Sequence, residues 1–135
     1  MPRRTEKPDV MIAIMGAPHA SDLVTSALRL TQALLDQGGR VNVWTCGYAT
    51  TLTQASLGEN KPRNVVDWSR DYPSSVTLVR GLLASNAERL AWYVCRFCSA
   101  ERGAAEQIDQ IRFASPFKFG EHVNAAGKAL FLGVV

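Results

Sequence analysis

The stretch "DVMIAIM", residues 9–15, is a short apolar run bounded by Asp9 and by the turn-forming Gly16-Ala17-Pro18. A continuous apolar run bounded in this way is typical of a strand that is buried on both faces of a parallel sheet. Two further segments have the same character, "RVNVWTC" at 40–46 and "LAWYVC" at 90–95. The three segments predict the central strands of one sheet.

Helical segments alternate with these strands. The first begins near Ser21, whose hydroxyl suits a helix N-cap, and stops at the pair Gly38-Gly39. The second opens at Pro73 and runs to about Glu88, and its apolar residues at helical spacing are Val76, Val79 and Leu83. This alternation of strands and helices predicts an α/β domain with a parallel sheet.

The remaining segments are shorter. A helical piece is expected at 49–57, and the polar stretch 58–73 reads as the longest loop. After the third strand, we expect a short helix over Ser99–Gln107 and a strand around 111–114. Ser115-Pro116 then fits a helix start, and "ALFLGVV" at 129–135 predicts a closing, fully apolar strand.

Composition restricts the class of protein. The 135 residues suit one domain, at 9–135, preceded by a basic tail at 1–8. No apolar run approaches the roughly 18 residues that a membrane-spanning helix needs. The net charge of +3 is spread along the chain and disfavours nucleic-acid binding. Because Glu6 and Asp9 interrupt the basic N-terminal region, a signal peptide is disfavoured, and we expect a cytoplasmic protein.

The cysteines are the chain's most reactive side chains. There are three, an odd number, and Cys95 and Cys98 are only three residues apart. This pattern is poor material for a secreted disulfide framework and better suits reactive or metal-binding thiols inside a cell.

Cys95 ends a predicted strand where a helix begins, at the sheet edge where ligands of parallel α/β folds gather. Unpaired N–H groups at a helix start favour a thiolate, and Arg96 and Arg102 add nearby positive charge. We therefore expect a lowered pKa and a nucleophilic Cys95. The alternative is that Cys95 fills the core as a small apolar side chain.

Zinc is a second alternative, because His19 and Cys46 are expected at the same edge as Cys95 and Cys98. However, structural zinc sites usually recruit a second closely spaced pair, which this chain lacks, and Cys46 reads as structural. The segment "GAPHASD" at 16–22 lacks the glycine patterns of nucleotide-binding loops, so no cofactor is predicted. Ser21 could still help to hold a small anion, and His19 could border the Cys95 cavity.

The pattern C-x-x-C-x-x-x-R-G at 95–103, after an apolar strand, resembles the DsrE-like family of sulfur-relay proteins. The opening stretch "IAIMGAPHASDLVTSALRLTQALLDQGGRVNVW", 12–44, and the closing apolar strand are also similar to that family. The resemblance implies a flavodoxin-like parallel sheet with helices on both faces, and assembly into oligomers.

The resemblance further implies that Cys95 carries sulfur as a persulfide and passes it between partner proteins. Our leading hypothesis is a cytoplasmic sulfur carrier or sulfurtransferase in which Arg102 stabilises charge and Cys98 resolves or assists transfer. Sulfur donor and acceptor proteins would be its partners, and the chain would form a homo-oligomer. The alternative is a non-catalytic, oligomeric interaction module with structural or zinc-binding cysteines.

Overall fold

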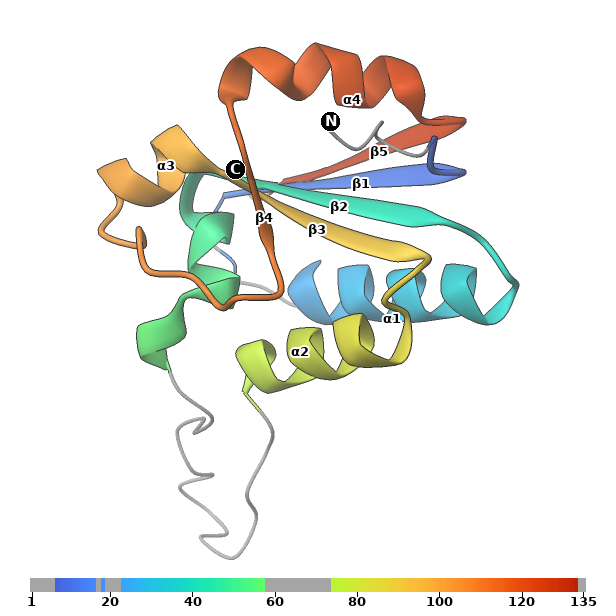
Figure 1. Ribbon diagram of the computed structural model, residues 1–135, viewed down its shortest axis with the longest axis horizontal. Coiled ribbons are helices and arrows are strands. Elements are labelled where there is room, and N and C mark those ends of the chain that lie inside the picture. Colours follow the sequence, from blue (N-terminus) through green and yellow to red (C-terminus); the bar gives the residue numbers. More distant parts are fainter. Residues whose placement is uncertain (1–6, 17, 19–22, 58–73, 134–135) are drawn as a thin grey trace, which may run out of the picture.

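The computed structural model describes residues 7–16, 18, 23–57 and 74–133. These residues include one parallel five-stranded sheet (Figure 1). The strand order is β4-β3-β2-β1-β5, so the first four strands are neighbours in chain order and β5 returns to pair with β1. The strands are β1 Val10–Met15, β2 Val41–Cys46, β3 Leu90–Cys95, β4 Arg112–Ala114 and β5 Lys128–Gly133. The three predicted central strands are confirmed.

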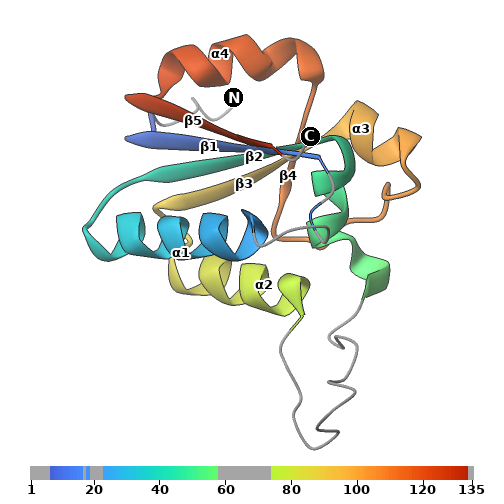
Figure 2. The ribbon, with the colours of Figure 1, turned by 180° about the vertical axis from the view of Figure 1, so that it is seen from behind.

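Helices cover both faces of the sheet. Helices α1 and α2 lie side by side on one face and α4 lies on the other, in both the front and the reverse view (Figures 1 and 2). The α-helices are α1 Leu23–Asp36, α2 Ser75–Ser85, α3 Arg96–Glu101 and α4 Phe119–Ala125; the 3-10 helices are η1 Gly47–Thr53, η2 Ala55–Leu57 and η3 Pro116–Lys118. The expected single-domain, flavodoxin-like α/β architecture is confirmed.

Side chains of each strand alternate between two apolar layers. On β3, Trp92 and Val94 belong to the larger layer, which packs against α1 and α2. Tyr93 and Cys95 belong to the smaller layer, which packs against Phe119 and other residues of α4. Because successive strand residues point to opposite faces, the cysteine that ends β3 must lie on the α4 side.

Helix α2 follows its sequence pattern closely. Ser74 is the N-cap, and its Oγ accepts a hydrogen bond from the backbone N–H of Thr77 at 3.2 Å. The apolar positions that the sequence singled out, Val76, Val79 and Leu83, are its buried residues. The helix ends at Ser85, earlier than expected, because the chain turns at 86–89 to enter β3.

Helix α3 begins three residues before the position expected from the sequence. Ser99 lies inside the helix, where its hydroxyl donates to the backbone carbonyl of Arg96, one turn back, at 3.0 Å. Gly103 ends the helix with a positive φ of 70°, and the N–H of Ala104 bonds to the carbonyl of Ser99 at 2.7 Å. The predicted bounds of 99–107 were therefore wrong, whereas the expectation that Cys98 lies in the first turn of the helix after Cys95 is confirmed.

The expected closing strand is confirmed as β5, Lys128–Gly133. It is the outer strand of the sheet, with Leu130 and Phe131 40% and 55% exposed. The apolar content of this run therefore does not reflect burial within one chain. Residues 134–135 of this prediction, the 58–73 loop, His19 and Ser21 lie outside the described residues. Among the helices that are described, none is long and apolar enough to cross a membrane.

Candidate functional site

The ends of β2 and β3 bring two cysteines together. The register pairs Val41 with Leu90 and continues to Thr45 with Val94, so the next residues, Cys46 and Cys95, end the two strands side by side. Both cysteines belong to the apolar layer on the α4 side. The parallel pairing therefore places two thiols on one face at the carboxyl edge of the sheet, where the ligands of such folds usually bind.

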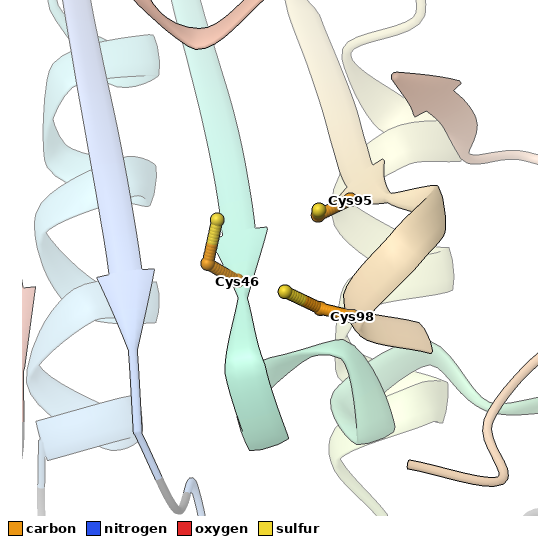
Figure 3. A group of neighbouring side chains, drawn as sticks. All are labelled: Cys46, Cys95 and Cys98. Atoms are coloured by element: carbon orange, nitrogen blue, oxygen red, sulfur yellow. The ribbon is translucent and has the colours of Figure 1, made fainter. Parts of the chain in front are cut away.

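A third thiol comes from α3. Cys95 is the N-cap of this helix, with extended backbone angles (φ −63°, ψ 115°), and the chain turns immediately so that Cys98 lies in the first turn. Figure 3 shows the three side chains close together, at the end of β2, at the end of β3 and on α3. The three Sγ atoms all lie within 4.8 Å of one another, and all three cysteines are free thiols. We call Cys46, Cys95 and Cys98 the thiol cluster.

Burial dominates the acidity of Cys46 and Cys95. Cys95 is fully buried, and desolvation raises the pKa of its thiol, although the backbone N–H groups of Cys98 and Phe97 partly oppose this effect. Desolvation also raises the pKa of Cys46, to about 11, and the charges of the neighbouring thiols add to the rise. The expectation that the helix start would lower the pKa of Cys95 was therefore wrong in direction: the amides act as expected, but burial outweighs them.

Trp44 supplies the cluster's strongest polar contact. Its indole N–H donates a hydrogen bond to Sγ of Cys46 at 2.8 Å, and this bond lowers the pKa of Cys46 against the effect of burial. Trp44 is itself fully buried and lies two residues before Cys46, on the same face of β2. Trp44 was not among the predicted site residues, although alternation along the strand places its side chain on the same face as the cysteine.

Arg102 lies at the same sheet edge, with its guanidinium 5.0 Å from the centre of the Tyr48 ring and one terminal nitrogen 3.3 Å from the Glu101 carboxylate. The other terminal nitrogen is 4.0 Å from the position that a Cβ on Gly47 would occupy. Among the described residues, Nε of Arg102 is buried without a hydrogen-bond partner. The structure thus places Arg102 beside the residue that follows Cys46, where it can meet an incoming anionic group.

Arg96, the other expected cation, faces away from this role. Its guanidinium stacks over the Phe113 ring at 4.5 Å. The main influences on the thiols of Cys46 and Cys95 are burial, hydrogen bonds and the other cysteines, rather than an arginine. The expectation that Arg96 and Arg102 together would lower the pKa of Cys95 is therefore not met.

A cavity of about 500 Å³ lies at the opposite end of the sheet. It is lined by Arg40, Arg89 and Arg112 among others, but by none of the predicted site residues. Arg40 and Arg89 each donate a hydrogen bond to backbone carbonyls, of Glu88 at 3.4 Å and of Leu35 at 2.6 Å. Because these arginines already stabilise turns and helix ends, we place the candidate site at the thiol cluster.

All three cysteines were expected at this edge of the sheet, but only two were expected to act together. Cys95 and Cys98 were predicted to act together, and their sulfur atoms do lie close. Cys46 was interpreted as structural, yet its sulfur belongs to the same group. The sequence feature that indicates a shared site is that Cys46 and Cys95 both end six-residue strands. Three close free thiols can exchange a disulfide, hold a sulfane sulfur or ligate a thiophilic metal ion.

The sequence matches no family model and no curated protein. The fold does have a counterpart among solved structures, the crystal structure of the YchN protein from E. coli. The two chains superpose with a TM-score of 0.73 and 20% sequence identity, over 92% of this chain and 98% of YchN. At this identity the likeness concerns the fold: this chain has the same α/β architecture as YchN over nearly its whole length.

Proposed function

We propose that this protein is a sulfur carrier of the DsrE-like type that accepts sulfane sulfur as a persulfide on Cys95. The observation that carries the proposal is the thiol cluster, in which Cys95 ends a central strand with the sulfurs of Cys46 and Cys98 within 4.8 Å. The C-x-x-C-x-x-x-R-G pattern at 95–103 and the shared fold with YchN support it.

In the first step, the Cys95 thiolate attacks the outer sulfur of a donor persulfide. The new bond joins Cys95 Sγ to that sulfur, the sulfur–sulfur bond of the donor breaks, and the donor leaves as a thiolate. The proton of Cys95 passes to solvent or to the leaving thiolate. Because Cys95 is fully buried, this step requires that docking of the donor exposes its sulfur. The backbone N–H groups of Phe97 and Cys98 then favour the negative charge of the persulfide.

The second step delivers the sulfur. An acceptor thiolate attacks the outer sulfur of the Cys95 persulfide, and Cys95 leaves as a thiolate. Alternatively, Cys98 attacks the inner sulfur, a disulfide forms between the two cysteines, and hydrosulfide leaves: the dithiol is oxidised by two electrons and the sulfane sulfur is reduced. Cys46 can act in the same way because its sulfur also lies within 4.8 Å of Cys95 Sγ. Arg102, beside Gly47, would stabilise the anionic groups that enter and leave.

Sulfur donor and acceptor proteins are the partners that this scheme requires, and we propose that the chain acts as a homo-oligomer. Several large apolar side chains of the described residues are exposed in the single chain, among them Phe117 at 92%, Phe97 at 63% and Phe131 at 55%. Exposed aromatic residues on this scale suit an interface better than a solvated surface. Phe97 lies in α3, two residues after Cys95, so a partner that packs on Phe97 would lie next to the thiol cluster.

The test uses three single variants, Cys46→Ser, Cys95→Ser and Cys98→Ser. Each reduced protein is incubated with a persulfide donor, and the mass of every cysteine peptide is then measured. We expect Cys95→Ser to lose loading while the other two variants retain it. Circular dichroism verifies that each variant is folded. Sulfur found on Cys46 or Cys98 while Cys95 is intact, or full loading of Cys95→Ser, would contradict the assignment.

The same variants assign the resolving thiol. If Cys98 attacks the Cys95 persulfide, Cys98→Ser accumulates the persulfide and releases less sulfide than the wild type, whereas Cys46→Ser behaves normally. The reverse pattern would make Cys46 the resolving residue. Equal sulfide release from wild type, Cys46→Ser and Cys98→Ser would instead mean that delivery goes directly to an acceptor.

A further inference from the structure

The thiol cluster has the composition and size of a metal site made only of sulfur. Its three Sγ atoms come from three separate segments and approach within 4.8 Å of one another. Three points this close have a common centre no more than about 2.8 Å from each, against about 2.3 Å for a metal–thiolate bond. Small rotations of the side chains therefore suffice to bring all three sulfurs to bonding distance.

The donor set distinguishes between metals. Within the described part of the chain, the group that could hold an ion contains three cysteines and no histidine or carboxylate. Structural zinc sites almost always have four protein ligands in a tetrahedron. Soft thiolate ligands select Cu(I), which is satisfied by three sulfurs in a trigonal plane. The cluster thus matches Cu(I) better than Zn(II), and hard cations such as Mg²⁺ or Ca²⁺ are excluded because they require oxygen ligands.

The surroundings of the cluster also suit a bound soft cation. Cys46 and Cys98 are half-buried and Cys95 is fully buried within the apolar layer of Trp44 and Tyr93, which limits the access of water and oxidants. The indole N–H of Trp44 donates to Sγ of Cys46 at 2.8 Å and so orients one sulfur. A donor of this kind is the usual second layer of a metal site, where it holds a ligand in place.

We propose that Cys46, Cys95 and Cys98 form a three-coordinate Cu(I) site. On binding, each thiol gives its proton to solvent and each sulfur donates an electron pair to the metal, with no change of oxidation state. This inference reaches beyond the proposed sulfur transfer and does not depend on it. Because Cys95 serves both, a bound Cu(I) ion prevents persulfide formation, so copper-loaded and sulfur-loaded chains exclude one another.

The experiment is an anaerobic titration of the reduced, intact protein with Cu(I) in competition with a chromophoric Cu(I) chelator. We expect one Cu(I) per chain, with sulfur-to-copper charge-transfer absorption in the ultraviolet. Cys46→Ser should weaken retention by more than about 100-fold, since even partners outside the ligand shell contribute about 10- to 100-fold. Cys98→Ser should do the same, which keeps the test valid if one variant fails to fold.

His122→Gln is the matched control, because His122 packs against Trp44 at 4.9 Å between ring centres but lies outside the thiol cluster. It should leave Cu(I) retention unchanged. Three results would overturn the proposal: the wild type retains no Cu(I), the Cys46→Ser variant retains Cu(I) as well as the wild type, or the His122→Gln variant loses it. Retention of Zn(II) but not Cu(I) in a parallel titration would overturn the choice of metal.

The sulfur-carrier proposal and the Cu(I)-site proposal can be tested independently. Sulfur loading is measured on the metal-free protein, where Cys46→Ser is expected to load normally on Cys95. Copper retention is measured on sulfur-free protein, where Cys46→Ser is expected to fail. Normal copper binding without sulfur loading would overturn only the proposed function, and normal sulfur loading without copper binding would overturn only the metal site.

Discussion

The hydrogen bond from Trp44 to Cys46 is open to a direct test with Trp44→Phe. This substitution keeps a buried aromatic ring but removes the N–H that donates to Sγ of Cys46 at 2.8 Å. The bond favours the thiolate and opposes the burial that raises the pKa of Cys46 to about 11. Removing it should therefore raise the pKa of Cys46 further and make this thiol less reactive at any given pH.

The size of the effect follows from the strength of the bond. A hydrogen bond to a charged group contributes about 1.5–3 kcal/mol. One pKa unit corresponds to about 1.36 kcal/mol, and the half-buried position of Cys46 screens part of the interaction. We expect the pH midpoint of Cys46 alkylation to rise by about one pH unit, which is roughly a tenfold slower alkylation below the midpoint.

Trp92→Phe is the matched control. Trp92 is also fully buried and lies on the neighbouring strand, but it faces the opposite apolar layer. Among the described residues its indole N–H has no hydrogen-bond partner. Both substitutions remove the same atoms from the core. Trp44→Phe loses a hydrogen bond, whereas Trp92→Phe removes a buried donor that has no partner. Trp44→Phe should therefore be the more destabilising, by about 1–3 kcal/mol in the free energy of unfolding.

The assay is alkylation of the metal-free protein over a range of pH, followed by the masses of the peptides that carry each cysteine, with urea unfolding of both variants. A rise in the Cys46 midpoint in Trp44→Phe, but not in Trp92→Phe, is the expected result. If lost packing dominates instead, Cys46 becomes more exposed and its midpoint falls in Trp44→Phe. A fall, or an equal shift in both variants, would refute the reasoning.

Three further predictions concern other parts of the fold. Burial lowers the pKa of His122 in the folded chain. As the pH falls, the unfolded chain therefore binds a proton at His122 before the folded chain does. The stability that neutral His122 contributes is complete above about pH 6.5 and is lost below it. Urea midpoints between pH 7.5 and 5.5 should fall less in His122→Gln than in the wild type, and equal slopes would contradict this. Gly47 has a φ of +61°, so Gly47→Ala should destabilise by about 1–2 kcal/mol in urea unfolding, whereas Gly81→Ala in helix α2, with open space for a Cβ, should stabilise the chain slightly. Phe131→Glu on the exposed edge strand β5 should shift the protein from oligomer to monomer in sedimentation, and Leu78→Glu on α2 should not; a monomeric wild type would contradict the proposed assembly.

The sequence by itself determined the local elements. Each central strand is a short apolar run ended by turn signals, and β1, β2 and β3 lie where these runs predicted them. The spacing of Val76, Val79 and Leu83 identified the buried face of α2. Cys95 was placed at the end of a strand, at the edge where chemistry is expected. These features depend on neighbouring residues and on side-chain periodicity, so a sequence pattern contains them.

The first residue of a helix and the position of a strand within the sheet were harder to predict from the sequence. The start of α3 depends on where β3 stops pairing, and the chain turns into the helix directly after Cys95. Ser99, the expected start of this helix, lies inside it and its hydroxyl bonds to a carbonyl of the preceding turn. The run that forms β5 is apolar enough for a central strand but lies at the sheet's edge. Apolar content predicts that a segment forms a strand, but not whether that strand is central or at the edge of the sheet.

Only the tertiary structure decided the composition of the candidate site and its acidity. Cys46 and Cys95 are far apart in sequence, and the register of β2 with β3 is what makes them neighbours. The same packing buries Cys95 completely and reverses the expected direction of its pKa. Motif spacing predicts which N–H groups lie near a sulfur, but desolvation depends on every segment that packs around it. The sequence could therefore locate the thiols, while long-range packing determined how many of them meet and how readily they ionise.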